Sequence, residues 1–284
     1  MMRQRSRKRM IIINRIISYI LMIILAIFFL FPLLYMISVS LNPSEIDIVN
    51  QMSSIKGFIP TTISIENFKD VFDRMPFQRF LFNSVLIVGT TIIAGLIVNS
   101  MMAYGLARFS FKGRKMLVSI IVALIIIPFE AIAIPLLLIT NKMGWLDSYQ
   151  VQIIPFIANP LYIFLLYQFF INFPKDLEEA ALIDGAGWFK IYWKIVLPLS
   201  RPVLASVAIL HFLMQWGSFL WPLMVTRGYT YRPLTVAMQT FFGQAPIYWG
   251  DIMAFATMMT IPVIILFIFL QNQFVKSVAT TGIK

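Results

Sequence analysis

Six long apolar runs, separated by polar segments, dominate the chain. Each run is close to the about 20 residues that an α-helix needs to cross the hydrocarbon core of a bilayer. Several runs contain proline, which transmembrane helices tolerate where neighbouring groups satisfy the freed carbonyls. The pattern therefore predicts an all-α polytopic membrane protein with six transmembrane helices. The predicted spans are 16–39, 80–106, 116–139, 151–171, 202–225 and 251–274.

The polar segments divide the chain further. Residues 1–15 form a basic arm, 16–39 the first span, 40–79 a loop on the outer face, 80–275 a core of five spans, and 276–284 a tail. Within the 40–79 loop, Ile65, Phe68 and Phe72 have helical spacing, so we expect a short helix that packs through these three side chains.

Composition excludes a soluble protein. Hydrophobic residues make up 60% of the 284 positions and charged residues 12%, about half of the roughly 25% charge of an ordinary globular domain. The mean hydropathy is +0.84. The chain has no cysteine, which excludes disulfides, thiolate metal sites and cysteine nucleophiles, and its single histidine argues against a zinc site. We expect no catalytic residue, no metal and no cofactor bound by this chain.

The meaning of the net charge of +11 depends on where the basic residues lie along the chain. Sixteen of the 23 lysines and arginines lie in the N-terminal arm, the second and fourth loops and the tail, and seven lie in the alternate segments. By the positive-inside rule, this asymmetry places both termini in the cytoplasm. The charge thus marks a membrane face, and we expect no nucleic-acid partner. The apolar core of the first span exceeds that of a typical signal peptide, so we expect an uncleaved anchor.

Segment 172–202, between the fourth and fifth spans, is too polar to cross a bilayer but carries helical signals. Pro174 suits a first helical turn, and acidic residues follow it. Gly185 and Gly187 then interrupt the pattern before a second amphipathic piece that ends at Pro198. The segment predicts a helix–turn–helix on the cytoplasmic face. An interfacial helix that only anchors the loop is the alternative.

The spacing within segment 172–202 resembles the EAA motif of ATP-binding-cassette (ABC) importer permeases. That motif is Glu-Ala-Ala, three residues, Gly, nine residues, then Ile-x-Leu-Pro, and Asp before the Gly is its common elaboration. The resemblance implies that this loop docks on an ATPase subunit and couples it to transport. The residues that carry the match are Glu179, Ala180, Ala181, Asp184, Gly185, Ile195, Leu197 and Pro198.

Shorter matches extend the resemblance over nearly the whole chain. Asn83-Ser84 opens the second span as in the family, and residues 104–108, Tyr-Gly-Leu-Ala-Arg, resemble Tyr-Ala-Leu-Ala-Arg with Gly105 as a departure. Trp216 lies in a segment like Trp-Asn-x-Phe-x-x-Pro-Leu, where Gly217 replaces the usual Asn. The chain is similar to the maltose-type, carbohydrate-uptake permeases. This implies a type I ABC importer permease fold and a bacterial cytoplasmic membrane location.

The same resemblance implies partners. The chain has no Gly-x-x-x-x-Gly-Lys-Ser/Thr phosphate loop, so ATP and Mg are expected on partner subunits. The expected assembly contains a second permease, two ABC ATPase subunits and an extracytoplasmic solute-binding protein. The permease subunits are expected to lie in the lipid bilayer.

Polar and aromatic side chains within the spans are candidates for the solute path, because a sugar needs hydrogen-bonding groups and ring faces. Instead of lining the path, Glu130 could be protonated or paired with a neighbouring subunit. His211 could instead form a hydrogen bond between helices. The candidates are Asn99, Glu130, Asn159, His211, Gln215, Trp216 and Ser218.

The function that these observations favour is ATP-driven import of a mono- or oligosaccharide. A permease for glycerol phosphate or another polyol is the alternative. A secondary transporter is more remote, because the chain shows none of the symmetric repeats typical of that class.

Overall fold

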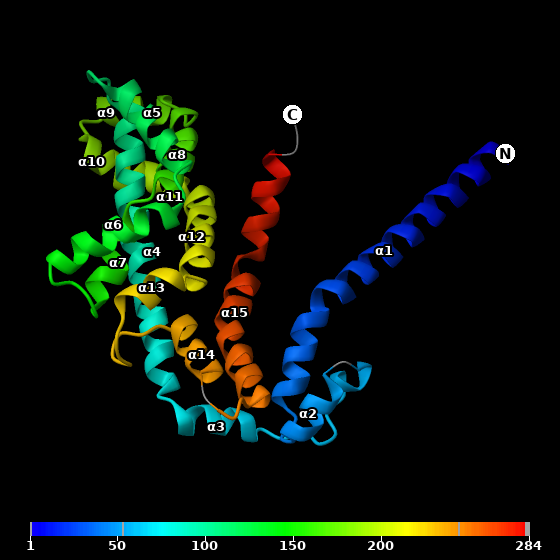
Figure 1. Cartoon of the computed structure of the whole chain (residues 1–284). Coiled ribbons are helices and arrows are strands. Elements are labelled where there is room, and N and C mark those ends of the chain that lie inside the picture. The colour runs from blue at the N-terminus through cyan, green and yellow to red at the C-terminus, as the bar shows by residue number, and fades with distance from the viewer. Residues whose placement is uncertain (1, 53, 244, 282–284) are drawn as a thin grey trace. The chain divides into compact units, whose positions relative to one another are not determined.

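The computed structural model describes residues 2–52, 54–243 and 245–281. Met1 and the end of the predicted tail, residues 282–284, lie outside this range. The described residues form helices joined by turns and loops, without a β-strand (Figure 1), and this confirms the all-α prediction. The chain divides into two compact units: unit 1 comprises Met1–Met75 and Thr240–Ile261, and unit 2 comprises Pro76–Gln239 and Pro262–Lys284.

Several helices are long and apolar enough to cross a membrane. Four pass as single stretches within the described residues. Two further pairs pass together but are bent, Arg114–Ile125 with Phe129–Lys142 by 103° and Trp188–Leu199 with Arg201–Trp216 by 77°. The number of spans reaches six if each bent pair counts as one. The four single stretches are Ile12–Ser40, Phe77–Arg108, Tyr149–Ile171 and Trp249–Phe269.

Unit 1 combines the N-terminal elements with the beginning of one long helix, α15. Its elements are α1 (Met2–Ser40), α2 (Glu45–Gln51), η1 (Ile55–Phe58), α3 (Glu66–Arg74) and the first turns of α15 (Trp249–Thr281). The Glu45 carboxylate accepts the backbone N–H groups of Trp249 and Gly250 at 3.0 and 2.6 Å. These amides are among the unpaired donors of a helix N-terminus, where a negative charge is favourable.

The α3 helix forms where the sequence predicts one, but it buries a different face. Of the three predicted side chains, Phe68 is half-buried, but Ile65 is 60% exposed and Phe72 is 39% exposed; Asn67 and Val71 are buried instead. The Asn67 amide nitrogen donates to the carbonyls of Ser40 and Asn42 at 3.0 and 2.8 Å. Because the last carbonyls of α1 need donors, an amide side chain occupies the inner face of α3.

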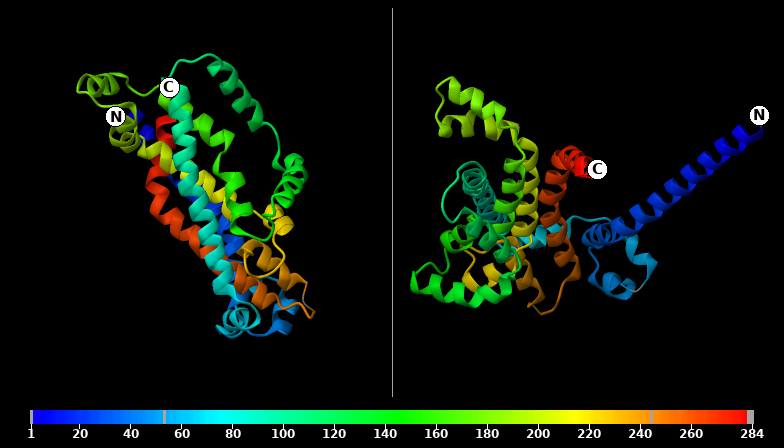
Figure 2. Two further views of the ribbon diagram at one scale, coloured as in Figure 1. Left: turned by 90° about the vertical axis from the view of Figure 1, so that its left-hand side faces the viewer. Right: turned by 90° about the horizontal axis from the view of Figure 1, so that it is seen from above.

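Unit 2 is organised around α4 (Phe77–Arg108). Helices α7 (Tyr149–Ile157), α8 (Pro160–Ile171) and α12 (Arg201–Trp216) pack along it. A buried hydrophobic cluster of the unit joins the second half of α4 to α8 and to the segment after α8. Figure 1 and the left view of Figure 2 show α9 and α10 at the end of the unit where α4 finishes. The remaining elements of this part are α5 (Arg114–Ile125), α6 (Phe129–Lys142), α9 (Asp176–Ile183), α10 (Trp188–Ile191), η2 (Tyr192–Val196), α11 (Leu197–Leu199), α13 (Leu220–Val225) and α14 (Leu234–Phe242), whose last three residues belong to unit 1.

Three of the predicted spans are interrupted. Span 116–139 breaks before Pro128, and span 151–171 breaks at Ala158 and Asn159, where the backbone is extended. Both breaks precede a proline, whose ring disfavours the helical conformation of the preceding residue. Span 202–225 breaks between α12 and α13, after Gly217. Hydropathy does not reveal such interruptions, because an apolar run is equally apolar when it is broken.

Candidate functional site

The segment that follows α8 forms a helix–turn–helix, as the sequence predicts. Its first arm, α9, begins at Asp176, two residues after the Pro174 that was expected in the first turn. Asp176, Glu178 and Glu179 lie in the first turn, where carboxylates complement the positive end of the helix dipole.

The turn after α9 depends on Gly185. Gly185 N donates to Leu182 O at 3.0 Å and Ala186 N donates to Ala181 O at 2.9 Å. These two bonds form a Schellman motif, which places the residue after the helix end in the left-handed region. Gly185 has φ +79° and therefore adopts without strain a conformation that most residues avoid.

The second arm continues past Pro198 rather than ending there. Residues of α10 lead into a π-helical turn, η2, in which Leu197 N–H donates to Tyr192 O. Proline has no N–H and its ring crowds the preceding turn, so a helix that contains one must adjust its hydrogen bonds locally. The segment ends at Ser200, whose hydroxyl donates to Val196 O at 2.6 Å, and α12 follows after the 77° bend.

The predicted coupling residues are distributed over an exposed and a packed side. Glu179, Ala180, Asp184, Gly185 and Pro198 are exposed; Ala181 is buried, and Ile195 and Leu197 are half-buried. Large apolar side chains are also exposed here, with Ile183 at 87% and Phe189 at 68%. Contiguous exposed apolar surface commonly marks a place where a protein or a membrane is contacted.

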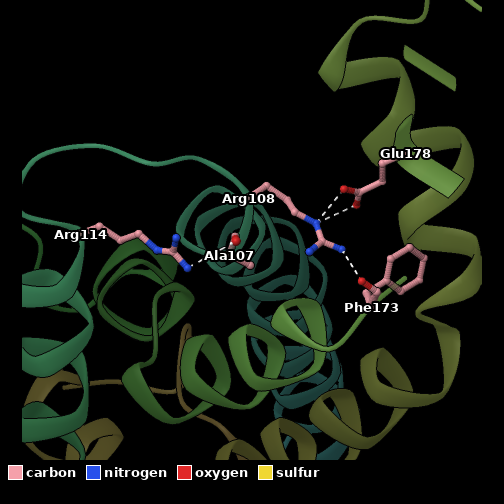
Figure 3. Close-up of polar contacts among 5 residues, drawn as sticks. All are labelled: Ala107, Arg108, Arg114, Phe173 and Glu178. Atoms are coloured by element: carbon pink, nitrogen blue, oxygen red, sulfur yellow. Dashed lines mark hydrogen bonds and ion pairs between the residues drawn. The ribbon is translucent and has the colours of Figure 1, made fainter. Parts of the chain in front are cut away.

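A buried ion pair anchors α9 to the end of α4. Arg108 Nε lies 2.9 Å from Glu178 Oε1 and 2.7 Å from Oε2, and Arg108 Nη2 donates to Phe173 O at 2.8 Å. Figure 3 shows the guanidinium directed at both acceptors. Each side chain of the pair is only 3% exposed. Removing one member of such a pair leaves an uncompensated buried charge, so the contact fixes where α9 lies.

Sequence reasoning missed this pair. In the sequence, Arg108 contributes to the cytoplasmic positive charge, and the adjacent Glu178 and Glu179 fit the acidic first turn of a helix; neither pattern indicates that they are paired. The sequence feature that points to the pair is the arginine that ends the Tyr-Gly-Leu-Ala-Arg run. An arginine at the end of an apolar helix needs an acidic partner if its side chain is buried. One-residue spacing puts the two glutamates about 100° apart around α9, since a helix turns once in 3.6 residues.

Three of the candidate path residues line one cavity. Gln215, Trp216 and Ser218 share a cavity of about 20 Å³ with residues of α4 and α7, roughly the space of one water molecule. Its wall includes Gln152, whose buried Oε1 has no hydrogen-bond partner among the described residues. The other lining residues are Ser84, Ile87, Val88, Trp221, Pro222, Pro233 and Thr235.

Three other candidates meet at the break between α7 and α8. Asn99 Nδ2 donates to Gly95 O at 2.6 Å and to Ile157 O at 2.8 Å, and Asn99 Oδ1 accepts Asn159 N at 2.8 Å. Asn159 Oδ1 in turn accepts Leu161 N at 2.9 Å and caps α8. His211 packs beside them, 2% exposed and against Gly95. The Asn99 side chain is thus occupied by backbone groups.

Glu130 lies apart from both sets. It is exposed in the first turn of α6, directly after the break at Pro128. Its position is favourable for a carboxylate because it faces the N-terminal end of the helix dipole. Among the described residues, no group of three or more His, Asp or Glu side chains is arranged to hold a metal ion.

Known proteins share both the sequence and the fold. The family model described as binding-protein-dependent transport system inner membrane component matches residues 91–280. The chain is 34% identical to the arabinooligosaccharides transport system permease protein of Halalkalibacterium halodurans, over 95% of this chain and 97% of that protein. It is 31% identical to the trehalose/maltose transport system permease protein of Thermococcus litoralis, over 96% and 98%. A chain from a bacterial ABC transporter involved in importing the acidic polysaccharide alginate matches with a TM-score of 0.80 and 25% identity, over 92% and 96% of the two chains.

Proposed function

The chain belongs to the family of inner-membrane components of binding-protein-dependent transport systems, and from this premise we propose that it is the permease subunit through which a mono- or oligosaccharide enters the cell. The sugar class is supported by the relatives, which are named for arabinooligosaccharide and for trehalose and maltose transport and match nearly the full chain. The chain itself carries out no catalysis in this proposal.

The assembly that we propose contains a second permease, two ABC ATPase subunits with their ATP and Mg, and an extracytoplasmic solute-binding protein. The observation that carries it is the exposed helix–turn–helix α9–α10. Glu179 and Ala180 face outward while Glu178 is held inside by Arg108. This arrangement offers a docking surface on a fixed base, at a segment whose basic flanks favour the cytoplasmic side together with both termini.

The mechanism follows from that placement. Closure of the ATPase dimer on ATP would displace the docked loop, and the permease would change access as rigid bodies move. ATP can shift the access equilibrium only by as much as it favours one state over the other. For the solute, we propose a path beside Gln215, Trp216 and Ser218, where the free acceptor of Gln152 suits a hydroxyl group. The cavity at these residues holds about one water molecule, so in this proposal a sugar enters only in an access state that widens it.

Uptake by the reconstituted complex tests the sugar assignment. The permease pair, its ATPase and its solute-binding protein are placed in proteoliposomes with internal ATP, and uptake is measured for a panel of labelled arabinooligosaccharides, maltose, trehalose and glycerol phosphate. We expect vanadate-sensitive uptake of at least one sugar. Uptake of glycerol phosphate alone would establish the polyol alternative, and uptake that persists without ATP would refute the ABC mechanism.

Charge reversal at the docking surface tests the coupling role. Glu179→Lys changes an exposed carboxylate of α9, so the permease should still fold but lose the ATPase subunit on purification or hydrolyse ATP without transport. Glu66→Lys is the matched control, because Glu66 is an exposed first-turn carboxylate of α3. Normal coupled transport in the Glu179→Lys complex would contradict the assignment of this surface.

A further inference from the structure

One face of α4 contacts both arms of the helix–turn–helix. Ser100, Tyr104 and Arg108 are four residues apart, so they form a stripe along the last turns of α4. We call these three residues the α4 stripe. Its members contact different parts of the segment that follows α8. Through them, α4 joins that segment to the rest of unit 2.

The contacts of the α4 stripe are of three kinds. Ser100 Oγ and Tyr192 Oη form a hydrogen bond of 2.7 Å, and the rings of Tyr104 and Tyr192 lie 5.3 Å apart. Arg108 holds Glu178 in α9 and the carbonyl of Phe173 before α9. Just beyond the stripe, the ring of Phe109 meets the ring of Trp188 edge-on at 5.2 Å. The first and second arms are therefore both fixed to α4.

Arg108 differs from the other members because its contacts are directional. Its planar guanidinium binds two acceptors from one segment at fixed angles, which an ammonium group does not reproduce. The pair is almost completely excluded from solvent, so water does not compete for it. Glu179, on the next position of α9, remains exposed. The surface offered to a partner and the anchor to α4 therefore lie on different faces of the same helix.

We propose that Arg108 is a positioning residue for coupling: through Glu178 it makes α9 and α4 move as one body, so that displacement of the docked loop is delivered to α4. From α4 the movement reaches α7, α8 and α12, which pack along it. This inference rests on the proposed function as a permease driven by a separate ATPase. It adds the residue pair that transmits the motion.

The test compares variants that keep size but remove the directional pair. Arg108→Lys keeps the charge without the planar fork, and Glu178→Gln keeps the shape without the charge. Arg114→Gln is the matched control, because Arg114 is a nearby arginine whose side chain, among the described residues, makes a single long hydrogen bond, to Ala107 O at 3.4 Å. The readouts are co-purification of the ATPase, ATP hydrolysis, and solute transported per ATP hydrolysed.

We expect Arg108→Lys and Glu178→Gln to retain the ATPase but transport roughly fivefold or more less solute per ATP, the lower end of typical coupling between sites. Arg114→Gln should match the wild type. Wild-type transport per ATP in both pair variants would overturn the inference. Absence of ATP-driven uptake in the wild-type complex would instead refute the proposed function, so the two failures are distinguishable.

A covalent replacement separates positioning from folding. The chain has no cysteine, so the double variant Arg108→Cys with Glu178→Cys carries two unique thiols that a short bismaleimide can link. We expect the unlinked double variant to be uncoupled and linking to restore transport per ATP. If linking leaves the ratio unchanged, or if the double cysteine variant loses the ATPase and linking does not recover it, the role of Arg108 is structural and the inference is wrong.

Discussion

Gly95 is the position in α4 where a single added methyl group has the clearest consequence. A Cβ atom there would lie 2.7 Å from His211 Cε1, 3.1 Å from His211 Nδ1 and 3.1 Å from Ile157 O. Ordinary contact begins near 3.4 Å, so the imidazole would have to retreat by about 0.7 Å. The carbonyl of Ile157 belongs to the α7–α8 break and is held by Asn99. Gly95→Ala therefore presses on two groups that have little room to move.

The cost follows from how tightly His211 is held. The ring is 2% exposed, lies 4.7 Å from the Tyr162 ring and is hydrogen-bonded to the backbone of Phe156. Adding a methylene to a packed interior costs about 1–3 kcal/mol. Against this, alanine in a helix is favoured over glycine by roughly 0.5–1 kcal/mol.

Gly105→Ala removes the helix-propensity contribution from the comparison. Gly105 lies in the same helix, and a Cβ atom there meets nothing within 4 Å. Both variants gain the same intrinsic propensity, so the difference between them isolates the contact with His211 and Ile157. At about 2–4 °C for each kcal/mol, we expect the detergent-purified Gly95→Ala protein to melt roughly 2–12 °C below Gly105→Ala.

Equal melting temperatures for these two variants would refute the close approach of His211 to α4. A double variant sharpens the result. In a His211→Ala background the clash partner is gone, so Gly95→Ala should lose most of its penalty, because residues in contact show non-additive effects. A penalty of unchanged size in that background would assign the cost to some group other than the imidazole.

Three further predictions concern other parts of the chain. Asn99→Leu leaves Ile157 O and Asn159 N unpaired, so the melting temperature should fall by the equivalent of about 1–3 kcal/mol while sugar affinity of the complex is unchanged; a changed affinity at constant stability would place Asn99 on the path. Glu45→Gln removes the charge at the start of α15 and should cost roughly 0.3–1 kcal/mol in thermal unfolding, whereas the exposed control Glu66→Gln should cost less. Gly185→Ala forces the left-handed conformation on a residue with a side chain at about 1–2 kcal/mol, so ATPase co-purification should weaken; Gly187→Ala, with φ −74° and open space, should not weaken it, and equal behaviour of the two would contradict the Schellman turn.

Much of the fold follows from patterns that a membrane imposes. Long apolar runs predicted helices because the bilayer core permits few alternatives, and the helices were found. The helix–turn–helix after α8 was also predictable, because Gly185 and the first-turn acids are local signals. Helix interruptions were not, because hydropathy is the same on both sides of a break. Only Pro128 and Pro160, read for their effect on the preceding residue, indicated where the chain leaves the helical conformation.

The candidate site was less predictable, for a reason that Asn99 and Arg108 illustrate. Sequence identifies a polar side chain in an apolar span but not the group that faces it. The sequence makes Asn99 a candidate for the solute path, and the structure shows the backbone groups to which its amide bonds. The sequence makes Arg108 a marker of the cytoplasmic face, and the structure shows its side chain buried against Glu178. The choice between Glu178 and Glu179 as its partner depends on how α9 is rotated, which no local pattern determines.

Three polar residues of α4 bind backbone outside that helix. Asn83 donates to the carbonyls of Thr230 and Arg232 at 3.1 and 2.8 Å, Asn99 bonds the α7–α8 break, and Arg108 bonds Phe173 O where α8 has ended. Each meets backbone that has left a helix, and backbone without a partner is costly wherever water is excluded. Because α4 supplies these donors, the neighbouring segments can leave the helical conformation without unpaired carbonyls. In unit 2, the α7–α8 break and two loop segments thus depend on donors of the unbroken helix α4, and this is why motion delivered to α4 would reach these three places together.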